Sequence, residues 1–234
     1  MKNRISIIPL ILAVLLIGFS ILSEVLPSRA PLSINWAVIS VSVTILAILA
    51  VIMEFERSPA GSKEVALVAV LGTLSALSRI PFAALPGVQP CTYLIICAGY
   101  ILGPVQGFMI GVMSALISNL MLGLGPWTPY QMIAWGLAGP VSHLLRRGSK
   151  ERPALSLIIL GGAWGFIFGA IMNLWFWTAF VYPLNLATFI ATMANSFWFD
   201  AMHSLGNLAF ISSLGGKTIT ILERFRDRFE VTLL

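Results

Sequence analysis

The chain has 234 residues, of which 58% are hydrophobic and only 10% are charged. A soluble domain carries about 25% charged residues, so this composition excludes an ordinary soluble protein and indicates a chain that crosses a membrane several times. The hydrophobic runs are continuous rather than alternating, which favours helices over a barrel. We therefore predict an all-α membrane protein. The net charge of +5 follows from its orientation in the membrane, as shown below, and we expect no nucleic-acid partner.

Two apolar runs stand at the beginning of the chain, at residues 5–25 and 34–53. The first follows two basic residues, as in a signal peptide, but it is longer than a usual signal core and lacks an obvious cleavage site. We interpret it as a retained anchor helix. The polar segment 54–64 contains Pro and Gly and is the best internal boundary. Residues 1–62 are thus predicted to form two transmembrane helices and a cytoplasmic linker.

A core of six hydrophobic segments is predicted within residues 63–216. The segments are expected at residues 65–80, 92–102, 105–122, 131–145, 155–177 and 186–214. Pro81 ends the first segment, because proline cannot continue a regular helix. The tail at residues 217–234 places basic, acidic and apolar residues at helical spacing. It is predicted to form a cytoplasmic amphipathic helix at the membrane interface.

The basic residues lie almost entirely on one side of the predicted membrane. With eight spans, the side that holds both termini carries every Lys and Arg except Arg29 and Arg79. Basic loops stay in the cytoplasm, so we predict a cell-membrane protein with both termini inside. The loops at 81–90, 123–130 and 178–185 are then extracellular, and none of them contains a charge.

Polar side chains within membrane spans are costly and are often functional. Arg79, Asn119, Gln131, Asn173 and Asn195 fall in the outer halves of different segments, beside the three uncharged loops. We therefore expect them to converge near the extracellular face.

Asp200 and His203 lie one helical turn apart in the last segment. A carboxylate beside an imidazole can serve as a general base, a proton relay, half of a metal site or a polar link between helices. Asp200 can also line a pocket, facing Arg79. No accompanying cluster supports a metal site, and we expect Cys91 and Cys97 to be small core residues.

The uncharged stretch 125–139 contains Pro126 and Pro129, which cannot both lie in a regular helix interior, so we expect a rigid loop that leads into a helix. Trp127, Tyr130 and Trp135 are amphipathic aromatics. The stretch forms either the wall of a small-molecule pocket or an aromatic belt that anchors a helix at the interface.

Small residues follow one another along the first core segment: Ala66, Ala69, Gly72, Thr73 and Ala76. Such a stripe permits close approach of another helix in lipid. Its partner is either another segment of this chain or another subunit.

Several motifs, taken in order, resemble the substrate-binding S component of energy-coupling factor (ECF) vitamin transporters. They are KEVALVA at 63–69, RIPF at 79–82, LPGVQP at 85–90, AGYILGP at 98–104, SN at 118–119, GPWTP at 125–129 and WGLAG at 135–139. The GPWTP stretch looks most like S components that handle cobalamin or a related corrinoid. The two additional helices in residues 1–62 depart from the usual six-helix pattern.

The resemblance implies a non-enzymatic importer subunit with no catalytic residue, metal or cofactor. Its partners would be a vitamin-like ligand, a transmembrane coupling subunit docked on the small-residue stripe, and two ATPase subunits. The expected ligand-binding residues are Arg79, Phe82, Gln89, Tyr93, Asn119, Trp127, Tyr130, Gln131, Trp135, Asn173, Trp177, Asn195 and Asp200. Two alternatives stay open: an intramembrane enzyme that uses Asp200 and His203, and a membrane assembly scaffold.

Overall fold

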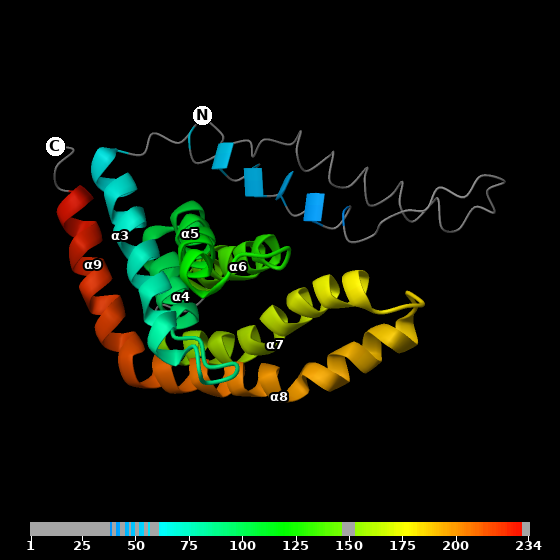
Figure 1. The fold of residues 1–234 in the computed structure, drawn as a ribbon. Coiled ribbons are helices and arrows are strands. Elements are labelled where there is room, and N and C mark those ends of the chain that lie inside the picture. Colours follow the sequence, from blue (N-terminus) through cyan, green and yellow to red (C-terminus); the bar gives the residue numbers. More distant parts are fainter. Residues whose placement is uncertain are drawn as a thin grey trace.

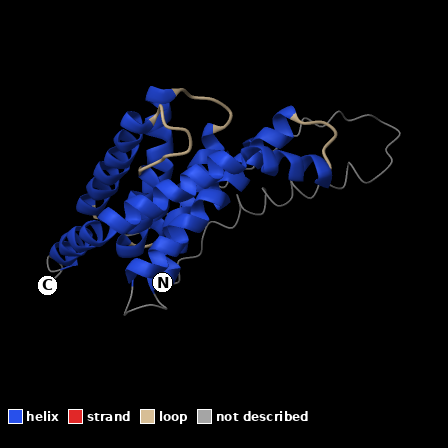
Figure 2. Cartoon of the chain, turned by 90° about the horizontal axis from the view of Figure 1, so that it is seen from below, coloured by secondary structure: helices blue, strands red, loops and turns tan. Residues whose placement is uncertain are grey.

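The computed structural model describes residues 61–146 and 153–230, together with individual positions between 38 and 56. Within this part of the chain every regular element is helical and no strand occurs, which confirms the all-α prediction (Figures 1 and 2). The elements are α3 (Ser62–Arg79), a 3-10 turn (Ile80–Phe82), α4 (Cys91–Leu102), α5 (Pro104–Leu122), α6 (Thr128–Arg146), α7 (Pro153–Phe180), α8 (Leu186–Phe210), a π turn (Ile211–Gly215) and α9 (Gly216–Glu230).

Proline and glycine set most of the helix boundaries. The α-helical part of α3 ends at Arg79, two residues before Pro81, and the chain continues as the 3-10 turn. Gly103 has φ = 123°, a value that side-chain-bearing residues rarely adopt, and it separates α4 from α5. Helix α6 begins at Thr128, earlier than the expected residue 131, because Pro129 fits the first helical turn, where its missing N–H costs nothing.

Four helical stretches of the described chain are long and apolar enough to cross a membrane: Ser62–Phe82, Pro104–Leu122, Leu155–Phe180 and Leu186–Arg228. Helix α4 is shorter, with 12 residues. At 1.5 Å per residue it is about 18 Å long, against about 30 Å for the hydrocarbon core of a bilayer. The protein is therefore a multi-pass membrane protein whose helices differ in length.

Helices α3 and α5 run parallel to each other. Near their starts Gln106 donates a hydrogen bond to Glu64, and near their ends Arg79 donates to Asn119. Between these two contacts, Ser75 Oγ and Ser114 Oγ lie 2.9 Å apart. This register matches the predicted topology, in which the first and third core segments cross the membrane in the same direction.

Helices α4, α5 and α6 meet at a cluster of three glycines, Gly99, Gly107 and Gly139. A Cβ atom at any one of the three would overlap the backbone of another. Helices α4 and α6 are also parallel. Trp135, in the first half of α6, donates to Thr92 at the start of α4, and Arg146 at the end of α6 donates to the Ile101 carbonyl at the end of α4. The absence of side chains at these three positions therefore lets the backbones of the three helices pack directly against one another.

Helices α7 and α8 form an antiparallel hairpin. Asn207 donates to the Gly161 carbonyl near the open end, and Trp177 Nε1 donates to Thr188 Oγ1 near the closed end. Asn185 caps α8 by accepting from the Thr188 backbone N–H at 2.9 Å. At the other end of α8 the chain turns sharply through the π turn into α9 (Figure 1).

The tail is helical from Gly216 to Glu230, as expected. Its apolar residues Ile219 and Leu222 are buried in the main core, and α9 packs against α4. The first predicted N-terminal helix, at residues 5–25, lies outside the described residues. The described positions of the second are helical, and Ile48 packs there against Phe108 and Val112 of α5.

The glycine cluster generates a prediction about stability. Replacing Gly139 with Ala should cost about 1–3 kcal/mol, because the added methyl group has no space and forces the helices apart. For a chain of this length each kcal/mol corresponds to a fall in Tm of about 2–4 °C, which thermal unfolding in detergent can measure.

The matched control is Gly206→Ala in α8, where the nearest atom to an added Cβ is Val88 Cγ1 at 3.5 Å. That distance is an ordinary van der Waals contact, so the Tm of Gly206→Ala should stay near that of the wild type. Equal Tm values for the two variants would show that the glycine cluster does not hold the helices together.

Candidate functional site

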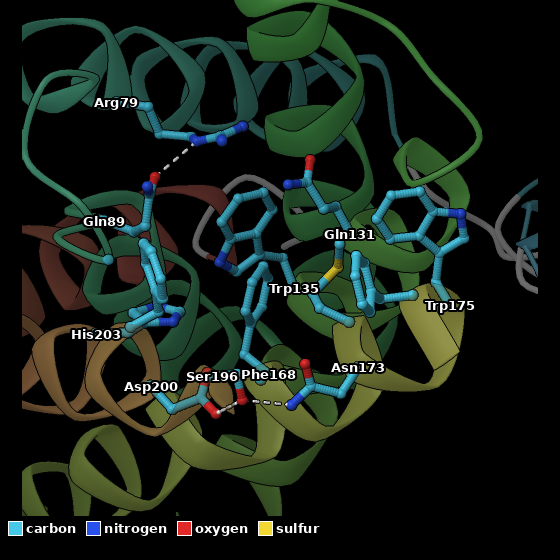
Figure 3. A pocket seen from close by; sticks show the side chains of 15 residues that line it. Arg79, Gln89, Gln131, Trp135, Phe168, Asn173, Trp175, Ser196, Asp200 and His203 are labelled. Carbon is cyan, nitrogen blue, oxygen red and sulfur yellow. Dashed lines mark hydrogen bonds between the residues drawn. The ribbon is translucent and has the colours of Figure 1, made fainter. Parts of the chain in front are cut away.

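A cavity of ≈ 440 Å³ lies between the end of α3, the loop that follows it, and helices α6, α7 and α8 (Figure 3). This volume is within the range of small-molecule sites, which is about 300–1,000 Å³. The lining residues are Arg79, Gly87, Gln89, Gln131, Trp135, Phe168, Gly169, Met172, Asn173, Trp175, Phe176, Ser196, Phe199, Asp200 and His203.

Arg79 dominates one wall of the cavity and is held by neutral groups. Its Nε donates to Gln89 Oε1 at 2.9 Å, and its Nη1 donates to Ser118 Oγ and to Asn119 Oδ1 at 3.2 Å. Asn119 Nδ2 donates in turn to Gln131 Oε1 at 2.7 Å. Through Asn119, this network fixes the position of the Arg79 guanidinium relative to the Gln131 amide, and both groups line the cavity.

The indole of Trp135 stacks beneath this guanidinium, with Arg79 Cζ 4.3 Å from the ring centroid. Trp135 Nε1 donates to Thr92 Oγ1 at 3.0 Å, and Thr92 Oγ1 lies 2.8 Å from His203 Nε2. Phe168 packs against both rings, with centroid distances of 4.7 Å to Trp135 and 4.8 Å to His203. The hydroxyl of Thr92 thus connects α4, α6 and α8 behind the aromatic wall.

Asp200 lies on the opposite side of the cavity from Arg79 (Figure 3). Ser196 Oγ donates to Asp200 Oδ2 at 2.8 Å, and Asn173 Nδ2 donates to Ser196 Oγ at 2.6 Å. Gly169 lies against the carboxylate so closely that a Cβ there would overlap it. This absence of a side chain is what allows Asp200 to sit between α7 and α8.

Six of the residues expected to bind a ligand line the cavity: Arg79, Gln89, Gln131, Trp135, Asn173 and Asp200. Asn119 supports two of them from behind, and Trp127 packs at 5.7 Å against Trp175, which is a lining residue. The six lining side chains come from four helices and one loop, so the fold brings them together at one cavity.

Five other expected residues lie away from this cavity. Phe82 and Tyr93 pack against Phe210, and Trp177 is bonded to Thr188 at the closed end of the hairpin. Tyr130 is buried with its hydroxyl unpartnered, while Asn195 is exposed on α8. Membrane depth cannot distinguish these residues from lining residues, because it does not specify which face of a helix points inward.

The site also contains residues that were not among the expected ligand-binding residues. From α7 they are Phe168, Gly169, Met172, Trp175 and Phe176; from the rest of the chain they are Gly87, Ser196, Phe199 and His203. Helix α7 is apolar on every side, so its sequence carries no periodic signal for a pocket-facing side. Ser196 could have been found, because it lies one turn before Asp200 on the same helix.

The spacing of Asp200 and His203 raised the possibility of a catalytic pair or a metal site. In the structure each group has a different partner: Ser196 for the carboxylate and Thr92 for the imidazole. Among the described residues, no group of three His, Cys, Asp or Glu side chains could hold a metal ion. Both Asp200 and His203 serve as parts of the cavity wall.

The small-residue stripe on α3 divides between two sides of the helix. Gly72 and Ala76 are buried, and a Cβ on Gly72 would lie 2.9 Å from Met113 Cβ of α5. Ala66 and Thr73 are exposed and Ala69 is half-buried. An open groove of ≈ 390 Å³ runs along this outer side and is lined by Ala69, Val70, Thr73, Leu74 and Leu77.

Comparison with known proteins identifies the family of the chain. A family model described as "ECF transporter, substrate-specific component" matches residues 63–220. None of the curated proteins and none of the solved structures compared with the chain matches it. Because the family match covers more than half of the sequence, the chain belongs to the substrate-specific components of ECF transporters, which are membrane transport subunits and not enzymes.

Proposed function

We propose that this protein captures a vitamin-like small molecule in the cavity between α3, α6, α7 and α8 and passes it to an ECF coupling module. The observation that carries the proposal is the cavity itself, in which charged and amide side chains from separate helices meet aromatic walls. Pockets of this kind combine apolar contact area with a few directional polar groups. The partners would be a transmembrane coupling subunit and two ATPase subunits.

A corrinoid is the largest ligand that the sequence resemblance suggests. The cavity of ≈ 440 Å³ is near the lower end of ligand-site volumes, which favours a smaller molecule with one or two rings. We therefore expect a small vitamin-like ligand, and we include cobalamin as the largest compound in the binding screen described next.

Binding can be measured on the full chain in detergent. Thermal unfolding should first be screened against the B vitamins and cobalamin, since a ligand at 100 times its Kd stabilises the folded protein by about 2.7 kcal/mol. The affinity of the compound that raises the Tm most is then measured by calorimetry. Gln131→Ala should weaken its binding by about tenfold or more, because loss of a buried hydrogen-bond partner costs about 1–3 kcal/mol.

Two control variants keep this result specific. Asn195→Ala removes an amide from the exposed side of α8, and His143→Ala acts in the last turn of α6, far from the cavity. Both should retain wild-type affinity. Loss of binding in either control, with Gln131→Ala unaffected, would place the ligand elsewhere and remove the support for this site.

We infer further that the cavity opens toward the extracellular side. The distribution of basic residues supports this orientation, because Arg79 and the uncharged loops lie at the end of the core opposite Lys63. Both native cysteines, Cys91 and Cys97, are fully buried, so single cysteines can be added to the natural sequence.

A membrane-impermeant maleimide applied to intact cells should modify Leu124→Cys, whose native side chain is 54% exposed. It should spare Lys63→Cys, at the exposed start of α3, until the cells are permeabilised. Labelling of Lys63→Cys alone in intact cells would invert the orientation that we propose.

The outer side of α3 is the surface that we propose for the coupling subunit. Its support is the combination of small residues, Ala66, Ala69 and Thr73, with an apolar groove beside them. Small residues allow another helix to approach closely in lipid. Gly72 and Ala76, which belong to the predicted stripe, are not part of this proposed surface, because they are packed inside the subunit.

Ala69→Trp and Thr73→Trp should prevent co-purification of the tagged chain with the coupling and ATPase subunits, while ligand binding by the isolated chain persists. Leu120→Trp is the matched control, because Leu120 on α5 is 65% exposed and lies outside the groove. If all three variants assemble normally, α3 contacts only lipid. If Ala69→Trp also abolishes ligand binding, the groove belongs to the internal packing of the subunit.

A further inference from the structure

The two charged residues of the cavity have no charged partner. Arg79 and Asp200 are 6% and 7% exposed. Neither takes part in an ion pair within the described chain. They lie on opposite walls of one cavity with no hydrogen bond between them (Figure 3). A buried charge without a counter-charge is costly, and most of all within a membrane.

The surroundings of Arg79 leave its charge and part of its hydrogen-bonding capacity unused. Gln89, Ser118 and Asn119 accept from Nε and Nη1, and all three are neutral. The two N–H groups on Nη2 have no acceptor among the described residues. These N–H groups can donate to an anionic group such as a carboxylate, which would also supply the missing negative charge.

The surroundings of Asp200 provide few hydrogen-bond donors and no positive charge. Its carboxylate accepts one hydrogen bond, from Ser196, although two carboxylate oxygens offer about four acceptor sites. Asn173 orients Ser196 from the neighbouring helix and brings no charge. A protonated amine or an amidinium group would supply both the missing donors and the missing charge.

His203 also lines the cavity, but it is not paired with Asp200. Its Nε2 lies 2.8 Å from Thr92 Oγ1, which accepts from the Trp135 indole. The described residues show no ion pair between His203 and Asp200, although the two lie one helical turn apart. Asp200 therefore has no cationic partner within the described chain.

Aromatic side chains separate the two charged walls. Trp135, Phe168, Trp175, Phe176 and Phe199 all line the cavity. Their faces favour a flat, conjugated ring through stacking and edge contacts. The volume of ≈ 440 Å³ suits a molecule of one or two rings with short substituents.

We propose that the cavity selects a flat zwitterion, with a conjugated ring between the aromatic walls, an anionic group against Arg79 and a cationic nitrogen group against Asp200. This inference rests on the proposed function, whose binding site it describes. Neutral rings, and rings that carry only one of the two charges, leave at least one buried charge unpaired and bind more weakly.

Three small probes test this rule directly on the full chain in detergent. The zwitterion is para-(aminomethyl)benzoate; the single-charge analogues are para-methylbenzoate and para-methylbenzylamine. The same three compounds with a biphenyl group in place of the single ring test a longer distance between the two charges. In calorimetry the zwitterion of at least one length should bind at least tenfold more tightly than both of its analogues.

The variant Asp200→Asn should remove the advantage of the zwitterion over the benzoate, because the amide keeps an acceptor for Ser196 but loses the charge. Asp227→Asn, at an exposed position of α9, is the matched control and should preserve that advantage. Arg79→Met should likewise remove the advantage over the amine, with thermal unfolding as a check on folding. If Arg79→Met does not fold, the probes and Asp200→Asn still decide the question.

The inference is overturned if a single-charge probe binds as tightly as the zwitterion at both lengths, if no zwitterion binds, or if Asp200→Asn retains the preference. Failure of the proposed function looks different. If the vitamin screen finds a tight ligand that lacks one of the two charges, the importer function stands and the zwitterion rule falls. If no vitamin binds but the zwitterion preference holds, the rule stands and the ligand class must be revised.

Discussion

The packing of Gly99, Gly107 and Gly139 is the constraint on which the site depends. Backbone atoms of α4, α5 and α6 are in direct contact there, so no side chain can separate the three helices. Trp135 lies one turn from Gly139, and Thr92 lies two turns from Gly99. The close contact therefore places the Trp135 indole within 3.0 Å of the Thr92 hydroxyl and builds a rigid back wall for the cavity.

Polar groups in the core form connected sets rather than isolated pairs. One runs from Gln89 through Arg79 and Asn119 to Gln131, and another from Trp135 through Thr92 to His203. A buried polar group that lacks a partner is costly in a membrane, so each member of a set requires the next one. The networks thus fix the orientation of the cavity-lining side chains before any ligand binds, which reduces the entropy lost on binding.

The helices could be predicted from sequence far better than the site. Continuous apolar runs and the residues Pro81, Gly103 and Pro129 determine where helices begin and end, and the six core segments are all present. Of the polar residues grouped by membrane depth, Arg79, Gln131 and Asn173 line one cavity. Membrane depth failed to separate Asn195 from Asn173, because rotation about a helix axis is set by packing between helices. Phe168 could not be predicted as a lining residue, because α7 is apolar on all sides and its sequence does not indicate which side faces the cavity.

Helix α3 contributes to both surfaces that we propose for the function of this protein. Gly72 lies on the inner side of α3 and packs on α5, and the helix ends at Arg79, which lies in the cavity wall. Its outer side carries Ala69 and Thr73 beside the apolar groove. A helix of 18 residues is a rigid body, so a ligand that binds Arg79 contacts the same element that carries the surface we propose for the coupling subunit. A displacement of α3 against Met113 would also displace the groove on its outer side. Helix α3 therefore offers a physical path from the cavity to the surface that we propose for docking.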